Sequence, residues 1–255
     1  MRLAKVDYHS YNGAVRSRSL HPWNVTVAEA QAIQWTLASQ VSKRSELSQE
    51  LRYIAGTDIS NTNKDGVAQA AVVVLSYPDM DVVEVRKHRG RPGFPYVPGL
   101  LSFRESPLIL EALEKLSITP DLLLVDGQGL AHPRRLGIAC HLGLLTNLPT
   151  IGCAKSRLIG HHWLLAREAG SWVKLEDQGE VVGAVVRTRD DTSPLYISIG
   201  HKVDLDAAIN WTLACCRGYR TPEPTRLAHH AAGGAIPEKE FNSGQGLVVQ
   251  QGSLL

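Results

Sequence analysis

The stretch Asp121-Leu122-Leu123-Leu124-Val125-Asp126-Gly127-Gln128-Gly129 decides the fold. Its consecutive apolar residues are typical of a strand buried on both faces of a sheet, because a half-exposed strand would alternate apolar with polar side chains. The run ends on a carboxylate, Asp126, and the two glycines that follow indicate a turn. The segment therefore predicts a buried strand with an acidic residue at its carboxyl end.

Further strand patterns lie on both sides of this segment. Tyr53 to Ser60 is a short strand candidate whose apolar run ends on a second carboxylate, Asp58. Two β-branched and apolar runs, Val67 to Tyr77 and Val82 to Val85, are separated by a turn at Pro78-Asp79 and predict a hairpin. Later strands are expected at Thr150–Ala154, Val181–Arg187 and Leu195–Ile199.

Helix signals alternate with the later strands. Thr26 and Glu29 have the spacing of a capping box before an apolar repeat. Ser106 and Pro107 are typical of an N-cap and a first helical residue, so they predict a helix start. The expected helices cover Val27–Val41, Ser106–Leu116, Pro133–Thr146 and Leu205–Cys216.

This element order predicts an α/β protein with a mixed sheet flanked by helices. Carboxylates at two strand ends, Asp58 and Asp126, are placed as the ribonuclease-H-like fold places its metal ligands, so we expect that fold in a single domain. The domain is expected to span residues 1–230. Gly, Gln and Ser dominate the chain end, which predicts a flexible tail over residues 231–255.

Composition excludes several protein classes. The chain has 255 residues and a formal net charge of +2, so binding to nucleic acid would need a local basic patch. Such basic residues are Arg86, Lys87, His88, Arg89, Arg91, Arg134, Arg135 and Arg157, although charge runs are more often solvated faces. None of the four cysteines forms a C-x-x-C pair, which argues against a zinc knuckle. We find neither a signal peptide nor a membrane span and expect a cytoplasmic protein.

Three carboxylates stand out as a candidate site: Asp58, Glu105 and Asp126. Carboxylates crowded at the end of a buried sheet would repel one another, and a hard divalent cation such as Mg²⁺ would remove that conflict. The alternative is that they are ordinary caps and surface ion pairs, because an acid at a strand end is common turn chemistry. Spacing along the chain does not show that the three side chains converge.

Five segments resemble the motifs of the endonuclease V family, in the family's order. They are Gly56-Thr57-Asp58, Pro95-Tyr96-Val97-Pro98-Gly99-Leu100-Leu101-Ser102-Phe103-Arg104-Glu105, Asp126-Gly127-Gln128-Gly129-Leu130-Ala131-His132-Pro133-Arg134, Ile151-Gly152-Cys153-Ala154-Lys155-Ser156-Arg157-Leu158 and Pro222-Glu223-Pro224-Thr225-Arg226-Leu227-Ala228-His229. Each motif alone is weak, and the set together is specific.

The resemblance implies a catalytic site of Asp58, Glu105, Asp126 and Lys155, in which the three acids bind Mg²⁺ and Mn²⁺ can substitute. It also implies that His229 is a fourth metal-site residue and that Lys155 stabilises phosphate charge. The alternatives are a solvated lysine at a strand end and, for His229, a surface residue in a loop beside His230.

The same resemblance implies a pocket for a flipped base. Tyr96 is expected to be a wedge that parts the strands, or alternatively to pack on the sheet. His132 either contacts the substrate or caps a turn, and the glycines either let the base approach or only supply turns. The implied substrate-binding residues are Tyr96, Pro98, Gly99, Leu101, Gly127, Gly129, His132, Ile138, Ser156 and Leu158.

The implied activity is a DNA-repair hydrolase, acting as a monomer on DNA that contains deoxyinosine. It would cut the second phosphodiester bond 3′ to the lesion and leave 3′-hydroxyl and 5′-phosphate ends. Two alternatives stay open: an endonuclease that acts mainly on inosine-containing RNA, and a non-catalytic nucleic-acid-binding module. Loss of ligands is usual in a degenerate module, and all the expected acids are present here.

Overall fold

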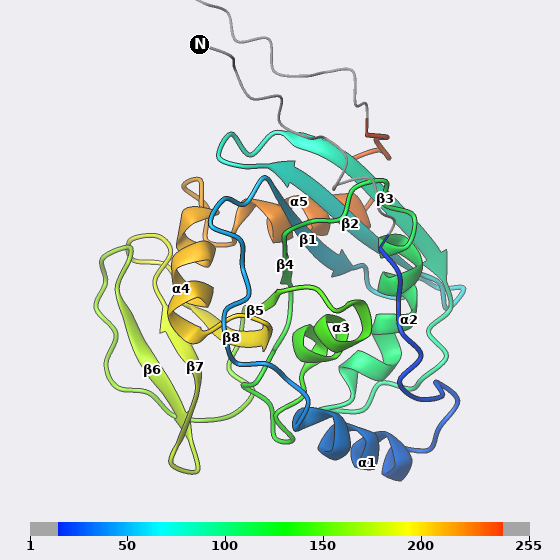
Figure 1. Cartoon of the computed structure of the whole chain (residues 1–255), viewed down its shortest axis with the longest axis horizontal. Helices are drawn as coiled ribbons and strands as arrows, with labels where there is room; N and C mark the ends of the chain where they lie inside the picture. The colour runs from blue at the N-terminus through cyan, green and yellow to red at the C-terminus, as the bar shows by residue number, and fades with distance from the viewer. Residues whose placement is uncertain (1–14, 242–255) are drawn as a thin grey trace, which may run out of the picture.

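The computed structural model describes residues 15–241, which form one eight-stranded mixed sheet flanked by five helices (Figure 1). The strands are β1 (Tyr53–Ile59), β2 (Ala68–Ser76), β3 (Val82–Gly90), β4 (Leu122–Val125), β5 (Thr150–Ala154), β6 (Trp172–Asp177), β7 (Glu180–Val186) and β8 (Leu195–His201). The helices are α1 (Val27–Ala38), α2 (Leu101–Leu113), α3 (Ile138–Thr146), α4 (Leu205–Ala214) and α5 (Glu223–Ala232). The predicted α/β, ribonuclease-H-like fold class is confirmed.

The apolar strand before Asp126 is central, as its sequence predicts. The strand order is β3-β2-β1-β4-β5-β8-β7-β6, and β4 pairs in parallel with both β1 and β5. All four residues of β4 are buried. Because parallel strands end at the same edge of a sheet, Asp58 and Asp126 are brought to one edge.

Alternating side chains fill two cores, one on each face of the sheet. Ala55, Leu123 and Val125 pack toward α2 and α3. Ile54, Leu122 and Leu124 pack on the opposite face with residues of α4. Helix α5 covers the same face as α4, over β1 and β2, through Ala228 and Ala231 (Figure 1). Because successive side chains of a strand point to opposite faces of the sheet, the position of a residue in its strand determines the face on which its side chain lies.

Helix α2 begins at Leu101, five residues before the predicted start at Ser106. The Ser-Pro pair is a typical helix start, but Ser106 is fully buried inside the helix and Pro107 lies in its interior. Gly99, with φ of +77°, turns the chain just before the helix. The correction matters because it places Glu105 on a helix rather than in the preceding loop.

Two elements are missing from the sequence prediction. β6 is an exposed edge strand with little apolar patterning. No helix was predicted over α5, because Pro222 and Pro224 begin it and polar residues follow; its small buried alanines are a weak apolar signal. Helix α3 starts at Ile138 rather than Pro133, β3 extends past Val85 to Gly90, and α1 and α4 end two or three residues early.

Helix α5 continues to Ala232, past the predicted domain end at residue 230. The greater part of the predicted tail, residues 242–255, lies outside the described residues, as do residues 1–14. Between residues 15 and 241, no helix combines the length and apolar character that crossing a bilayer requires.

Candidate active site

Asp58 and Asp126 are neighbours at the carboxyl end of the parallel strands. The register pairs Thr57 with Val125, and the Asp126 backbone N–H donates to the Thr57 carbonyl at 3.2 Å. Asp58 is the penultimate residue of β1 and Asp126 directly follows β4. Their side chains are only 12% and 13% exposed, so they are crowded and largely shielded from water.

His229 reaches this edge because α5 packs directly on β1. A Cβ on Gly56 would lie 2.0 Å from the Pro224 carbonyl carbon, so only glycine allows this close approach. The His229 Nδ1 lies 2.7 Å from the Asp58 Oδ2, while the Ile59 N–H donates to the Asp58 Oδ1 at 2.7 Å. The expected neighbourhood of His229 and Asp58 is present, on a helix rather than in a loop.

Lys155 adds a cation to the same edge. It follows β5, and its ammonium forms an ion pair with the Asp126 carboxylate. The Arg220 guanidinium donates to the Lys155 carbonyl at 2.6 Å and to the Pro194 carbonyl at 2.9 Å, which fixes the backbone around the lysine. The Lys155 ammonium is thus held beside the Asp126 carboxylate, while part of its side chain stays exposed.

Glu105 completes the acid cluster from the first turns of α2. Burial, together with the negative charges of Asp58 and Asp126, raises the pKa of its carboxyl to about 8, and the nearby Arg104 guanidinium opposes this rise. Burial and the charge of Asp126 also raise the pKa of Asp58. The three carboxylates therefore lie close enough for their negative charges to affect one another.

The donor set fits a hard divalent cation. Carboxylate oxygens are the ligands that Mg²⁺ prefers, and a cation among them would relieve the mutual repulsion that raises their pKa values. In the part of the chain described, no three His, Cys, Asp or Glu side chains already stand in a ligating arrangement. Asp58 is paired with His229, and Asp126 is paired with Lys155.

The raised pKa of Glu105 predicts a pH-dependent stability. At pH values between the ordinary glutamate pKa of 4.5 and the native pKa of about 8, Glu105 of the folded protein keeps a proton that the unfolded chain has released. The stabilising effect is therefore complete below the ordinary pKa and is lost as the pH rises through the native pKa, by at most about 1.4 kcal/mol per pH unit. In EDTA, urea unfolding of the wild type should show a declining free energy across this window, and Glu105→Gln should flatten the decline. Parallel curves for the two proteins would contradict the prediction.

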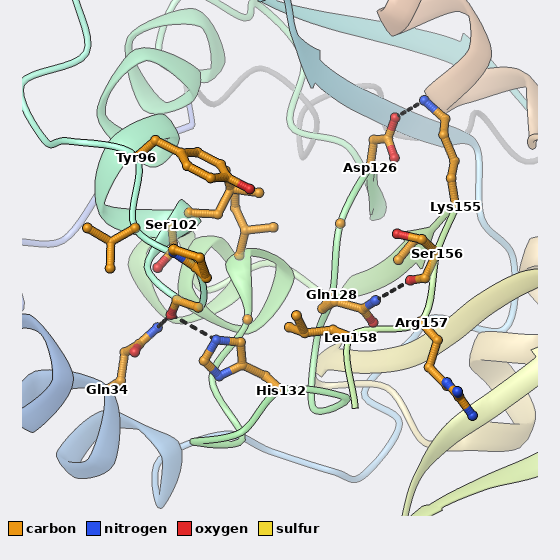
Figure 2. Close-up of a pocket in the computed structure, with 18 residues that line it drawn as sticks. Gln34, Tyr96, Ser102, Asp126, Gln128, His132, Lys155, Ser156, Arg157 and Leu158 are labelled. Atoms are coloured by element: carbon orange, nitrogen blue, oxygen red, sulfur yellow. Dashed lines mark hydrogen bonds and ion pairs between the residues drawn. The ribbon is translucent and has the colours of Figure 1, made fainter. Parts of the chain in front are cut away.

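A cavity of about 330 Å³ opens beside Asp126 and Lys155. Figure 2 shows Tyr96 and Ser102 along one wall and Asp126, Lys155 and Ser156 along the other. Nine of the ten predicted substrate-binding residues line it: Tyr96, Pro98, Gly99, Leu101, Gly127, His132, Ile138, Ser156 and Leu158. The structure thus gathers residues from α2, α3 and the loops after β3, β4 and β5 around one space.

Gly129 is the exception, because it does not line the cavity. A Cβ there would lie 2.0 Å from the Ile199 carbonyl oxygen, so this glycine lets the loop after β4 pack against β8. Gly152 of β5 likewise allows close packing against this loop, because a Cβ there would lie 2.5 Å from the Gly129 nitrogen. Gly127 borders the cavity, and a Cβ there would meet the Ile138 Cγ2 at 2.5 Å.

His132 holds one cavity wall in place. It is buried, and burial lowers its pKa to about 4, so the ring is neutral near pH 7. Its Nε2 lies 2.9 Å from the Gly99 carbonyl, and its Nδ1 accepts from the Arg134 N–H at 3.2 Å. The Gly99 carbonyl also accepts from Arg134 and from Gln34, so three donors fix the loop that carries Tyr96. His132 therefore holds the turn, as one of the two alternatives predicted, and it also lines the cavity.

Tyr96 does not pack on the sheet, which was the alternative to a wedge. Its side chain is 72% exposed at the mouth of the cavity, between Pro95 and Pro98. Leu158, on the opposite loop, is also exposed. The ring is therefore available for contact with a partner.

Further residues line the cavity that were not predicted to bind substrate. Gln34 of α1 carries no recognisable sequence signal, whereas Ser102, Gln128 and Arg157 lie within the motifs quoted above. The Ser102 Oγ and Gln128 Oε1 are buried and have no hydrogen-bond partner among the described residues. Since buried polar atoms are normally paired, two orphaned ones in a cavity lining suit a polar ligand.

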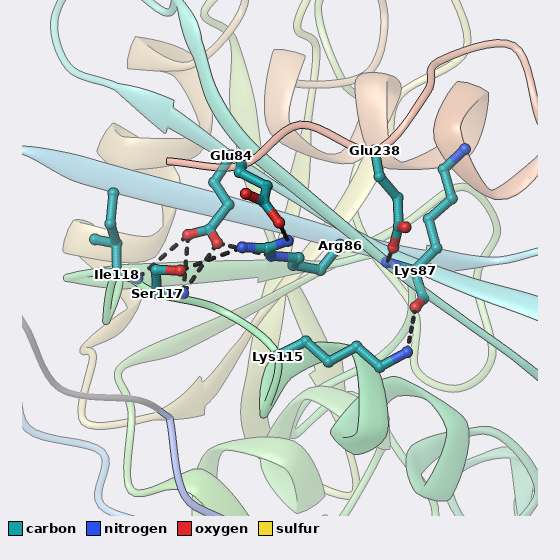
Figure 3. Close-up of polar contacts among 8 residues, drawn as sticks. Glu84, Arg86, Lys87, Lys115, Ser117, Ile118 and Glu238 are labelled. Atoms are coloured by element: carbon teal, nitrogen blue, oxygen red, sulfur yellow. Dashed lines mark hydrogen bonds and ion pairs between the residues drawn. The ribbon is translucent and has the colours of Figure 1, made fainter. Parts of the chain in front are cut away.

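Half of the predicted basic residues are used inside the protein. Figure 3 shows Arg86 bound to the buried Glu84, which also accepts from the Ser117 and Ile118 backbone N–H groups. Lys87 donates to the Ile236 carbonyl and, through its backbone, to Glu238. Arg134 binds Gly99, and Arg135 binds Asp177 and Glu180. Lys87 therefore anchors the chain after α5 to β3, and Arg89, Arg91 and Arg157 are the exposed arginines of the set.

Comparisons with known proteins agree with the motifs. The sequence model of the endonuclease V family matches residues 35–230. An endonuclease V from Dehalococcoides mccartyi is 54% identical over 218 residues, which cover 86% of this chain and 97% of that protein. The crystal structure of endonuclease V from Streptomyces avermitilis has a TM-score of 0.78 at 39% identity and covers 88% of this chain and 97% of that one. The Ciona intestinalis endonuclease V, solved with a 24mer DNA containing an inosine followed by a ribo-adenosine, has a TM-score of 0.69 at 29% identity, covering 82% of this chain and 96% of that one.

Proposed function

The chain belongs to the endonuclease V family, and from this premise we propose that it is an Mg²⁺-dependent endonuclease of DNA repair that recognises deoxyinosine. It hydrolyses the second phosphodiester bond on the 3′ side of the lesion and leaves 3′-hydroxyl and 5′-phosphate ends. Mn²⁺ substitutes for Mg²⁺. The relatives are nucleases acting on phosphodiester bonds, and a Ciona relative has been solved with inosine-containing DNA.

One observation carries the proposal: the acid cluster and the cavity share a border. Asp126 and Lys155 belong to the cluster and also line the cavity. A nucleotide held in the cavity would therefore keep its backbone next to the carboxylates. This arrangement supports a nuclease that binds a base in one place and cuts the chain nearby.

The residues at this edge of the sheet have different roles in the proposed reaction. Asp58, Glu105 and Asp126 would hold the divalent ion, which stabilises phosphate charge and activates the attacking water when bound. His229 orients Asp58 through the 2.7 Å contact and is close enough to contribute to the same site. Lys155 places an ammonium where negative charge develops on the phosphate.

The cavity supplies recognition of the base. The neutral His132 and its neighbours fix the Gly99 carbonyl and hence the loop that carries Tyr96. Main-chain groups around Gly99 and Gly127 can approach a flipped base, because no side chain intervenes. The unpaired Ser102 Oγ and Gln128 Oε1 offer further polar contacts with the edge of the base.

A parallel assay tests the proposed function. Inosine DNA, inosine RNA and matched adenine controls are incubated with the protein, with Mg²⁺ or with EDTA. We expect Mg²⁺-dependent cutting of inosine DNA one nucleotide beyond the lesion. Cutting of RNA alone would support the endoribonuclease, and binding without cutting in any condition would support a non-catalytic module.

The exposure of Tyr96 predicts a role in duplex opening. Stacking of a base on an aromatic ring is worth about 1–3 kcal/mol by alanine substitution, and unstacking costs most in a paired duplex. Tyr96→Ala should therefore impair cutting of inosine in a duplex by roughly tenfold or more and in a single strand less. Tyr96→Phe keeps the ring and should be mild on both substrates. Equal losses on both substrates, with a lowered melting temperature, would show a structural role instead.

Three smaller points complete the proposal. A cytoplasmic location is supported by four cysteines that are all free thiols. The single domain is supported by the continuous sheet, and the tail by its composition. We also propose that the protein acts as a monomer.

A further inference from the structure

A second cavity adjoins the acid cluster and is not used by the base-recognition site. It has a volume of about 290 Å³ and is lined by Ile59, Ser60, Asn61, Thr62, Ala68, Pro92, Tyr96, Arg104 and Glu105. Glu105 belongs to the acid cluster, and Ile59 and Ser60 directly follow Asp58. The first cavity borders the cluster at Asp126 and Lys155, whereas this one borders it at Glu105. Tyr96 lines both.

The lining suits a sugar–phosphate unit. Arg104 donates to the Phe94 carbonyl at 2.8 Å and to the Thr62 Oγ1 at 2.9 Å, so its guanidinium is fixed at the wall. A guanidinium has five N–H donors, which leaves others for a phosphate oxygen. Asn61 is exposed and can offer an amide to a sugar or phosphate. Ligand clefts span about 300–1,000 Å³, so this volume suits one backbone unit rather than stacked bases.

Charged residues flank the lining of the cavity in sequence. Arg91 precedes Pro92, and Lys64 lies two residues after Thr62 and beside Asp65; all three charged side chains are exposed. Within the cavity, Glu105 is the one acidic residue of the lining. An anionic strand that leaves the acid cluster on this side would therefore have Arg91 and Arg104 as cationic partners.

We propose that this second cavity binds the nucleotide on the 3′ side of the bond that is cut. The inference rests on the proposed function. With the lesion in the first cavity and the cut at the second bond, one nucleotide lies beside Tyr96, and the strand then passes the acid cluster. The next sugar and its 5′-phosphate, which becomes the end of the product, enter the space beside Arg104 and Asn61.

The test couples a change in the substrate to a change in the protein. Single-stranded inosine oligonucleotides carry at that position a normal nucleotide, an abasic sugar, or a propanediol spacer that lacks the sugar. For the wild type, the abasic sugar should be tolerated, and the spacer should lower kcat/KM and affinity in EDTA by roughly tenfold. Asn61→Ala and Arg104→Lys should weaken the normal substrate and be far less sensitive to the spacer. Asn210→Ala, an exposed asparagine on α4, is the matched control and should behave as the wild type.

The outcomes separate this inference from the function on which it rests. Equal sensitivity to the spacer in the wild type and both variants, with inosine cutting intact, would overturn the cavity assignment alone. No inosine-dependent cutting by the wild type would overturn the proposed function, and binding in EDTA would still show whether the cavity contacts the sugar. Melting curves identify any variant that fails to fold, and Asn61→Ala alone then decides, because its side chain lies on the surface.

Discussion

Asp126→Ala should lower the rate of inosine-DNA cutting by roughly 10³-fold or more, because it removes a shared cation ligand and the partner of Lys155 together. Binding to inosine DNA in EDTA should remain measurable, since the cavity is lined mainly by other residues. Single-turnover cleavage with Mg²⁺ and fluorescence anisotropy in EDTA give the two quantities separately.

The variant should also remain folded. The Asp126–Lys155 pair is partly exposed on the lysine side, and such pairs contribute about 0–1 kcal/mol, while removal of one carboxylate relieves the repulsion on Asp58 and Glu105. Asp79→Ala is the matched control, because Asp79 is exposed in the turn between β2 and β3, at the far end of β2 from Asp58. Normal turnover by Asp126→Ala would remove the metal-site assignment, and a collapse of the melting temperature would make it a structural residue.

Strong periodic signals predicted the centre of the fold. The apolar run before Asp126 and the alternating hairpin strands were each long enough to identify the elements, and parallel pairing then put Asp58 and Asp126 at one edge. Helix α5 could not be predicted in the same way, because it buries mainly alanines and one proline-led turn against β1. Its position depends on Gly56, which has no side chain. The sequence shows this glycine but does not show that Pro224 of α5 packs against it.

The candidate site was predicted in composition but not in geometry. The motif resemblance supplied the acids, Lys155 and His229, and the structure adds that Glu105 comes from a helix and that His132 is tied to the Gly99 carbonyl. Gln34 was not predicted, because a single glutamine on a helix carries no signal of the loop it will contact 65 residues later. Likewise, the three glycines that were predicted to bind substrate looked alike, although Gly129 packs on β8 and, of the three, Gly99 and Gly127 border the cavity.

That difference between glycines makes Gly127 the sharpest test of the base-binding cavity. A Cβ at Gly127 would lie 2.5 Å from the Ile138 Cγ2, so a larger side chain must displace Ile138 or project into the space intended for the base. Gly127→Val should therefore weaken binding to inosine DNA by roughly 100-fold, about 2.7 kcal/mol, and binding to undamaged DNA far less. Affinities for both DNAs, measured in EDTA, give the comparison.

Two further variants separate loss of the cavity from loss of the fold. Gly93→Val places the same side chain at an exposed glycine with no atom within 4 Å of the added Cβ, and it should bind both DNAs as the wild type does. Ile138→Leu removes the Cγ2 that the new Cβ would meet, so Gly127→Ala combined with Ile138→Leu should bind inosine DNA better than Gly127→Ala alone. Rescue would show that the contact with Ile138 limits the space for the base. Equal losses on inosine and undamaged DNA for Gly127→Val, with a lowered melting temperature, would instead show that Gly127 serves the fold, since a blocked cavity weakens only the complex that uses it.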